Sequence, residues 1–271
     1  MINRAHVLYQ DEEHLCLQFS DLVKGEGIQS NQFMIIDNQR AALIDPGGDL
    51  TFAALSIEVE KFSSIDNLDY IFASHQDPDI IASLPKWLMK SQTQIITSRL
   101  WSRFLPHLVP GYMSGVGGLN LEERVVGLPD FGGEIRLGES KIMVVPAHFL
   151  HSVGNFQFFD VKSRILFSGD MGASLVDGEA AAMAVEDFKA HVPSMAGFHQ
   201  RYMTSNKACR HWAAAVRKLN PRMIVPQHGA FFQGEQMEEF LVWIENLKCG
   251  VDLIDESFYL PRVSQFETAV A

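Results

Sequence analysis

The chain has few cysteines, no long hydrophobic run and more acidic than basic residues. Its cysteines are Cys16, Cys209 and Cys249, with no C-x-x-C pair, which excludes a disulfide framework and a cysteine-ligated iron–sulfur or rubredoxin-type site. We expect buried free thiols. No apolar run approaches the ~20 residues that span a bilayer, and the N-terminus has no hydrophobic signal region. We therefore expect a cytoplasmic protein without membrane insertion.

The charge balance argues against two classes of partner. The 271 residues include 33 acidic and 22 basic side chains, with a formal net charge of -11. Nucleic acid and anionic membranes repel such a surface, so neither is an expected partner. The hydrophobic content of 47% is ordinary for a globular domain with a buried core.

The order of the expected elements predicts an α/β fold. Strands come first, helices are then interleaved with strands, and a helix–strand–helix unit follows. This order favours two mixed sheets packed face to face with helices outside. One domain is predicted for residues 1–250, followed by a tail at 251–271. We expect strands at residues 15–19, 32–36, 41–44, 70–73, 94–97, 125–127, 134–137, 141–145, 156–161, 164–167 and 223–225, and helices at 52–62, 80–91, 207–219 and 236–247.

Metal-binding side chains alternate in residues 75–79 (HQDPD), directly after an apolar strand. Three further candidates from downstream segments lie next to predicted strands. Imidazole and carboxylate are donors that iron, manganese and zinc accept, and one aspartate can bridge two ions ~3.5–4 Å apart. A binuclear metal site is therefore predicted. Its ligands are His75, Asp77 and His151 for one ion, Asp79 and His228 for the other, and Asp170 as the bridge.

Two nearby residues are candidates for supporting a ligand histidine from outside the site. His148 lies three residues before His151 on the same loop, and Asp45 follows a predicted strand. Outer groups of this kind orient metal-bound imidazoles. For Asp45, the role of an ordinary turn residue fits equally well. The remaining histidines are expected to be structural: His6, His14, His107, His191, His199 and His211.

The motifs resemble, in type and order, those of the metallo-β-lactamase superfamily. The resemblance extends from about residue 30 to residue 231. It implies an αββα sandwich with the metal site at one edge of the two sheets. The motifs are residues 42–48 (ALIDPGG), 75–79 (HQDPD), 151–154 (HSVG), 167–170 (FSGD) and 225–229 (VPQHG).

Within the superfamily, the ligand pattern resembles the flavodiiron branch. Hydrolytic members show H-x-H-x-D-H, whereas flavodiiron proteins show H-x-E-x-D-H, and Asp77 supplies a carboxylate at the discriminating position. An anionic ligand stabilises ferric iron and suits oxygen chemistry, so the resemblance implies two iron ions as cofactor. Arg201-Tyr202 also resembles a flavodiiron stretch, which makes Tyr202 the one catalytic candidate, lining a pocket for a diatomic ligand.

The sequence differs from the flavodiiron pattern in two respects. Ile80 replaces the last histidine of the first motif, which either leaves an open position for water, O2 or NO or weakens metal retention. No flavodoxin-like FMN domain is recognised, so no bound flavin is expected and electrons would come from an external donor. The chain thus resembles the stand-alone di-iron proteins that bind oxygen, some of which report to chemotaxis receptors.

Two main functions follow as expectations. The first is a non-haem di-iron protein that binds O2 or NO, acting as an oxygen sensor or as a slow reductase. The alternative is a binuclear hydrolase of the lactonase, thioesterase or phosphodiesterase type, in which a metal-bound hydroxide attacks the substrate. The charge of Asp77 reduces Lewis acidity and favours the first function. A metal-poor interaction module is a third possibility, and homodimer formation is left open.

Overall fold

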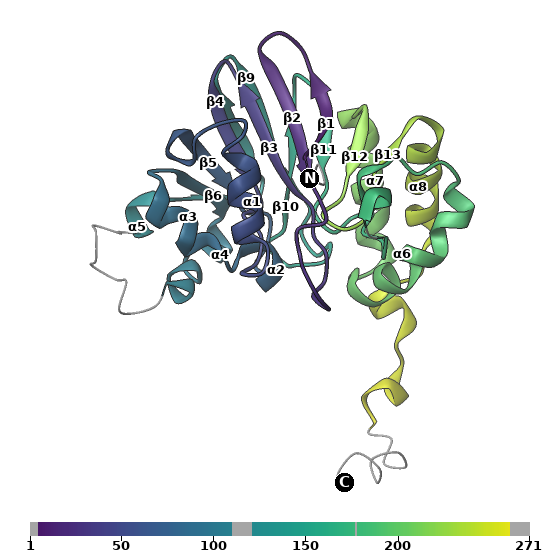
Figure 1. The fold of residues 1–271 in the computed structure, drawn as a ribbon. Helices are drawn as coiled ribbons and strands as arrows, with labels where there is room; N and C mark the ends of the chain where they lie inside the picture. The colour runs from purple at the N-terminus through teal and green to yellow at the C-terminus, as the bar shows by residue number, and fades with distance from the viewer. Residues whose placement is uncertain (1–4, 110–120, 177, 261–271) are drawn as a thin grey trace.

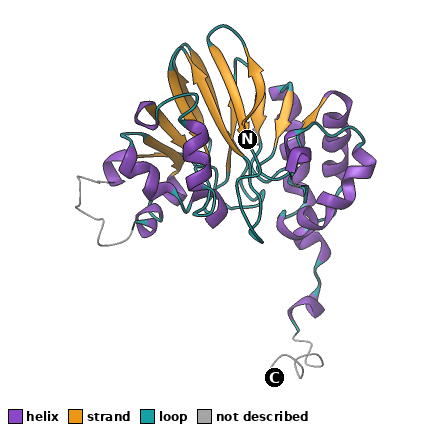
Figure 2. Cartoon of the chain, in the orientation of Figure 1, coloured by secondary structure: helices purple, strands orange, loops and turns teal. Residues whose placement is uncertain are grey.

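Two β-sheets pack face to face, and helices cover the outer face of each sheet (Figure 1). The computed structural model describes residues 5–109, 121–176 and 178–260. Figure 2 shows the strands gathered between two groups of helices. The predicted αββα sandwich is therefore confirmed.

The first sheet is built from the N-terminal half of the chain. Its seven strands follow in sequence order, β1 to β7. Neighbours are antiparallel from β1 to β4 and parallel from β4 to β7, so β4, β5, β6 and β7 end at the same edge of the sheet. The strands are β1 (Ala5–Gln10), β2 (His14–Phe19), β3 (Gln32–Asp37), β4 (Arg40–Ile44), β5 (Leu68–Phe72), β6 (Gln94–Ser98) and β7 (Val125–Leu128).

The second sheet has the strand order β13-β12-β11-β10-β9-β8. Only β11 and β12 are parallel among its described pairs. The strands are β8 (Gly133–Leu137), β9 (Ser140–Pro146), β10 (Phe156–Asp160), β11 (Ile165–Phe167), β12 (Met223–Val225) and β13 (Phe232–Gln233).

The helices divide between the two outer faces. Helices α1 and α3 pack on the first sheet through residues such as Leu55 and Trp87. Helices α6, α7 and α8 pack on the second sheet through residues such as Met195, Trp212 and Phe240. The α-helices are α1 (Phe52–Val59), α2 (Pro78–Ile81), α3 (Leu84–Lys90), α4 (Arg99–Ser102), α5 (Leu121–Arg124), α6 (Phe188–Tyr202), α7 (Asn206–Leu219) and α8 (Gly234–Asn246), and the 3-10 helices are η1 (Ile65–Asn67), η2 (Leu105–Leu108), η3 (Gly178–Ala182), η4 (Gly250–Leu253) and η5 (Glu256–Tyr259).

Aromatic side chains fill the layer between the sheets. The rings of Phe33 and Phe167 lie 4.9 Å apart, and those of Phe72 and Phe158 lie 5.0 Å apart. Each pair joins one sheet to the other, and all four rings are buried. Such pairs add ~0.5–1.5 kcal/mol to the effect of burial alone, so the two sheets form a well-packed frame for the loops at their edges.

Most predicted elements occur, but the prediction of one continuous helix at residues 80–91 is wrong. It is split into α2 and α3. Between them, Ser83 donates its backbone N–H to Gly47 O (3.0 Å) and its hydroxyl to Pro46 O (2.7 Å). Pro85, in the first turn of α3, favours a new helix start there. The helix predicted at residues 52–62 ends earlier, at Val59.

Helix α6 and strand β1 are among the elements that the sequence did not predict. Helix α6 buries only Phe188, Met195 and His199, and it contains Pro193, so it lacks a continuous apolar stripe. Strand β1 pairs only with β2 and is largely half-buried or exposed. Both elements are stabilised by tertiary contacts that a local pattern does not reveal.

The end of the described chain extends away from the sandwich (Figure 1). Its last element, η5, exposes Phe258 and Tyr259. The predicted division into a domain at residues 1–250 and a tail stays a prediction, and residues 261–271 of that tail lie outside the described residues. In the described part of the chain, no helix has the length and apolar character needed to cross a bilayer.

Candidate metal centre

Four loops at one edge of the sandwich carry the six predicted ligands. Strands β5, β11 and β12 end at this edge and β10 begins there, so segments far apart in sequence meet. Pro78 is the first residue of α2 and fixes the backbone next to two of the aspartates. We name the six side chains the ligand cluster: His75, Asp77 and Asp79 after β5, His151 before β10, Asp170 after β11, and His228 after β12.

Four members of the ligand cluster surround one point. Donor atoms of His75, Asp77, His151 and Asp170 all lie within 4.8 Å of one another. His151 Nε2 is 2.7 Å from Asp170 Oδ2 and 3.3 Å from Asp77 Oδ2. His75 Nε2 is 3.6 Å and 3.7 Å from the same two oxygens. Donors that bind one ion at ~2 Å lie roughly 3–3.7 Å apart, so this group has the dimensions of a metal site.

The other two members face the second oxygen of Asp170. His228 Nε2 lies 3.5 Å from Asp170 Oδ1 and 3.5 Å from Asp79 Oδ2. The two oxygens of Asp170 therefore face different groups, as a bridging carboxylate requires. The structure thus brings all six predicted ligands together in the predicted division. Metal binding by these atoms stays a prediction.

Two buried atoms of the ligand cluster lack a hydrogen-bond partner among the described residues. They are His75 Nε2 and Asp170 Oδ1. Buried polar atoms without a partner are costly and call for a physical explanation. Cations bound between these donors would satisfy both atoms, and the mixed imidazole and carboxylate set suits iron, manganese or zinc. The residues present therefore fit a binuclear metal centre.

The charges of the ligand cluster shift its pKa values strongly. Burial alone would lower the pKa of His151, but hydrogen bonds to Asp170 and Asp77 outweigh it and raise this pKa to about 10. Burial would also lower the pKa of His228, but its interaction with Asp170 outweighs this effect and raises the pKa of His228 to about 9. Burial would raise the pKa of Asp170, but His75 and its imidazole neighbours hold this pKa well below the ordinary value. Protons on the histidines thus balance the carboxylates, a role that cations can take over.

Outer hydrogen bonds orient two of the ligand histidines. His228 Nδ1 lies 2.7 Å from the carbonyl oxygen of Gln29. Because a carbonyl can only accept, Nδ1 carries the proton and Nε2 is directed at the cluster. His75 Nδ1 lies 2.9 Å from Ser74 Oγ, which leaves its Nε2 facing Asp170. Sequence reasoning missed the role of Gln29, whose contribution is a backbone atom that any residue could supply.

Asp45 supports His75 indirectly. Its Oδ1 accepts a hydrogen bond from the backbone N–H of Ser74 (2.8 Å), and its Oδ2 accepts one from Gln227 Nε2. Burial raises the pKa of Asp45 to about 7. Asp45 thus acts on the ligand histidine through the backbone of Ser74. It fixes the residue before the first ligand.

His148 has a different partner from the one predicted. Its Nε2 lies 2.6 Å from the carbonyl oxygen of Asp130, in the turn between β7 and β8. Its ring also packs against Phe156 at 5.5 Å. These contacts attach the loop that precedes His151 to the second sheet. They give His148 a structural role at the base of that loop.

Aromatic side chains of α6 form a wall beside His151. The ring of Tyr202 lies 5.5 Å from that of His151, edge to face, and the ring of Phe198 lies 6.1 Å away. Tyr202 and Phe198 stack on each other at 4.8 Å. Tyr202 is 53% exposed, so it stands at the rim of the ligand cluster. The structure places it close to a predicted ligand, and its role at a pocket for a diatomic ligand stays a prediction.

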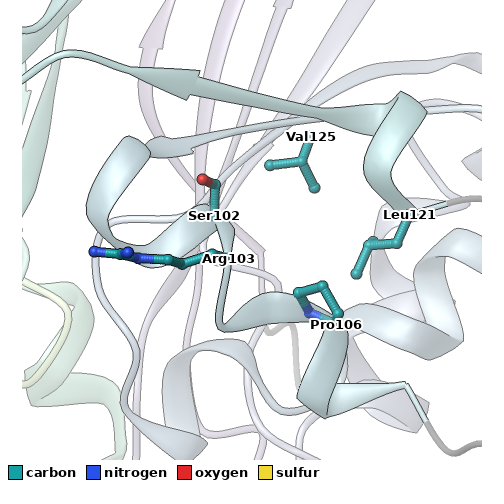
Figure 3. Close-up of a pocket in the computed structure, with 5 residues that line it drawn as sticks. All are labelled: Ser102, Arg103, Pro106, Leu121 and Val125. Carbon is teal, nitrogen blue, oxygen red and sulfur yellow. The ribbon is translucent and has the colours of Figure 1, made fainter.

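A separate cavity of about 290 Å³ lies under β7. Figure 3 shows its lining side chains, with the guanidinium of Arg103 extending away from Val125 and Leu121. The described residues that line it, Ser102, Arg103, Pro106, Leu121 and Val125, include no member of the ligand cluster. We assign no chemistry to this cavity.

The sandwich with the ligand cluster at its edge defines the class of this chain as the metallo-β-lactamase fold. A family model described as ODP family beta lactamase matches residues 28–229, about three quarters of the chain. The chain belongs to this ODP family.

Two solved structures of the chemotaxis sensor ODP are similar over nearly their whole length. One, described as its peroxy diiron species, is 40% identical, covers 93% of this chain and 98% of its own, and has a TM-score of 0.81. The other, its apo state from T. denticola, is 41% identical, covers 92% and 96%, and has a TM-score of 0.80. Together with the family match, they confirm the predicted resemblance to the flavodiiron-like branch of the metallo-β-lactamase superfamily.

Two longer proteins are also similar to this chain. A flavo di-iron protein from Thermotoga maritima is 21% identical with a TM-score of 0.68 over 88% of this chain and 60% of its own. A putative diflavin flavoprotein from Synechocystis sp. is 26% identical over 209 residues, which are 75% of this chain. The chain spans about a third of the length of this curated relative. Neither similarity shows that this chain has the activity of the longer protein.

Proposed function

We propose that this chain is a non-haem di-iron protein that binds O2 at the ligand cluster and acts as an oxygen sensor. The observation that carries the proposal is the shared carboxylate of Asp170, whose two oxygens face the two halves of the cluster. When bound, a pair of iron ions supplies the electrons that O2 needs to bind covalently. The similarity to the peroxy diiron species of a chemotaxis sensor supports this choice of metal and ligand.

The residues of the chain set the conditions for that chemistry. The three carboxylates would balance positive charge on the metals and the three neutral imidazoles would complete the donor set, which favours ferric iron over zinc-type Lewis acidity. The carbonyl of Gln29 and the hydroxyl of Ser74 fix two imidazoles before metal enters. Ile80 is fully buried and offers no donor. We propose that the second ion keeps a coordination position free of protein.

Tyr202 is proposed to line the space in which the diatomic ligand lies. Its ring stands next to His151, and Phe198 holds it by stacking. The phenol can donate a hydrogen bond to a bound ligand. Tyr202→Phe keeps the ring and removes this donor, so metal content should be unchanged while the O2-bound form decays up to ~10-fold faster. Equal decay in both proteins would leave Tyr202 a packing residue.

The partners are proposals of the same kind. NO, a second diatomic ligand, would fit the same position as O2. We propose an external donor as the source of electrons for the metals. The likeness to a chemotaxis sensor supports a receptor-type partner in the cytoplasm. A homodimer is compatible with the exposed apolar end of the chain.

One experiment tests the proposal directly. The protein is purified without oxygen, its metals are quantified, and its absorption spectrum is followed after exposure to O2. Iron approaching a pair of ions per chain, and a visible charge-transfer band that forms on exposure, are the expected results. Zinc in place of iron, no band, and cleavage of generic esters or phosphodiesters would instead favour the hydrolase.

A further inference from the structure

His199 is a buried histidine outside the ligand cluster whose two nitrogens have different partners. Its Nε2 accepts a hydrogen bond from the backbone N–H of Gly172 at 3.0 Å. Its Nδ1 lies 2.8 Å from the carbonyl oxygen of Met195, one turn earlier in α6. Because the amide can only donate and the carbonyl only accept, the proton lies on Nδ1. Burial lowers the pKa of His199 to about 4 and keeps it neutral.

Gly172 belongs to the tight turn that carries Asp170. Within this turn, Ser168 Oγ donates to Met171 O (2.7 Å), and Met171 N–H donates to Ser168 O (3.1 Å). Gly172 has a φ of +97°, and a Cβ added there would lie 2.8 Å from Phe232. The backbone at Gly172 is therefore confined between the second sheet and His199.

Helix α6 also contacts a member of the ligand cluster directly, through its aromatic side chains. Phe198 and Tyr202 lie against His151, which is 2.7 Å from Asp170 Oδ2. One helix thus touches a ligand histidine with its rings and the turn of the bridging carboxylate through His199. These contacts fix the position of His151 relative to Asp170.

We propose that His199 is a positioning residue that sets the bridging carboxylate of Asp170 by fixing its turn to α6. The inference rests on the proposed function, since it assumes that Asp170 bridges two metals. A shift of the turn would move both oxygens of Asp170 together and would alter both ions. His199 itself is not one of the six proposed ligands.

Two variants separate the hydrogen bonds of His199. His199→Gln places an amide oxygen near the position of Nε2, so it can still accept from Gly172 but loses the bond to Met195. His199→Asn places an amide nitrogen near the position of Nδ1, so it keeps the bond to Met195 but loses Gly172. Each variant removes one hydrogen bond from the same buried place, so the two should destabilise the metal-free protein similarly.

The test titrates each protein with Co²⁺ under anaerobic conditions and records the visible cobalt spectrum, alongside urea unfolding without metal. We expect His199→Asn to weaken binding by ~10–100-fold and to shift the cobalt bands, as loss of an outer partner of a metal site does. His199→Gln should stay within about threefold of the unchanged protein. Cobalt behaviour that is alike in all three proteins, or altered equally in both variants, would overturn the proposal.

A second measurement needs no variant. In protein labelled with ¹⁵N-histidine, the His199 nitrogens report their tautomer and their hydrogen bonds. Zinc binding should shift the Nε2 resonance, because the Asp170 turn reaches it through Gly172. Unchanged His199 resonances would contradict the inference. If zinc binds and His199 responds but iron binds no O2, the proposed function fails while the positioning role stands.

Discussion

Two clusters of histidine and aspartate lie at opposite edges of the sandwich and differ in how their polar atoms are satisfied. In the ligand cluster, His75 Nε2 and Asp170 Oδ1 are buried without a hydrogen-bond partner among the described residues. At the other edge, His14 Nδ1 lies 2.8 Å from Asp37 and Nε2 lies 2.8 Å from Asp160, with all three side chains fully buried. We name this triad the His14 cluster.

The His14 cluster joins the two sheets and needs no metal. Asp37 ends β3 in the first sheet, and Asp160 ends β10 in the second. Asp37 also accepts from the backbone of Glu139 (2.7 Å), and Asp160 from that of Ser163 (3.0 Å). The same residue types therefore form a closed network at one edge and an incomplete one at the other. Unsatisfied nitrogen and oxygen atoms that converge on one point, more than composition, distinguish the ligand cluster from the His14 cluster.

The largest expected difference comes from removing one carboxylate at each edge. Asp170→Ala should lose both metals, with more than the ~100-fold weakening that an outer partner costs, because each half of the cluster depends on this residue. Asp160→Ala is the matched control and should keep its metal content while losing stability. Metal quantification after anaerobic loading decides. Full metal retention by Asp170→Ala would refute the ligand assignment.

Removal of the central histidine should show that the His14 cluster is structural. His14→Leu leaves two buried carboxylates facing each other without their cation. Breaking a buried ion pair in this way costs ~3–5 kcal/mol, which urea unfolding would reveal. Metal bound per folded chain should not change. A loss of metal with unchanged stability would reverse the roles assigned to the two clusters.

The two edges should also differ in how pH affects stability. In metal-free protein, the pKa values of His228 and His151 are raised to about 9 and about 10. Because these lie above the unfolded value of 6.5, their stabilisation is complete below about pH 6.5 and is lost as the pH rises toward 10. In zinc-loaded protein the ligand imidazoles stay neutral, whereas those of the unfolded chain take up protons below about pH 6.5, so this edge should instead lose stability at low pH. The raised pKa of His14 contributes in the same direction with and without zinc. Parallel pH profiles of unfolding free energy with and without zinc would contradict this.

The smallest expected effect concerns Cys16, whose Sγ lies 3.4 Å from His14 Nε2. A cysteine, a histidine and an aspartate so close could in principle hold an ion, but here both nitrogens of His14 are already hydrogen-bonded. Cobalt-loaded protein should therefore show no thiolate-to-cobalt absorption. Cys16→Ala should cost only ~1 kcal/mol. A thiolate band that this substitution abolishes would reveal a second metal site.

The ligand cluster was predictable because its members lie in short turns at strand ends. The strands that carry Asp170 and His228 are parallel, so their ends must meet at one edge. The supporting contacts were not predictable. The bond from His228 to the carbonyl of Gln29 joins residues 199 positions apart, and a backbone acceptor leaves no trace in the sequence. His199 was read as structural for a similar reason, since its partner is the backbone of Gly172.

The fold shows the same limit. Helix α7 was predicted almost to the residue, because its apolar side chains repeat on one face and Asn220 ends it in a left-handed conformation. Helix α6 was missed, because Pro193 interrupts its pattern and few of its side chains are buried. A helix that lies against a predicted ligand thus had a weak local signal.

The last turn of α6 also connects the ligand cluster with an exposed segment of the chain, through side-chain contacts on its two sides. Arg201 lies over the ring of Phe258, 5.6 Å from its centroid, in the segment that extends from the body, while the adjacent Tyr202 faces His151. A protein that binds the projecting segment would therefore lie next to a helical turn whose other side contacts His151, a predicted ligand. If O2 binding changes the affinity of this chain for such a partner by some factor, binding of the partner changes the affinity for O2 by the same factor.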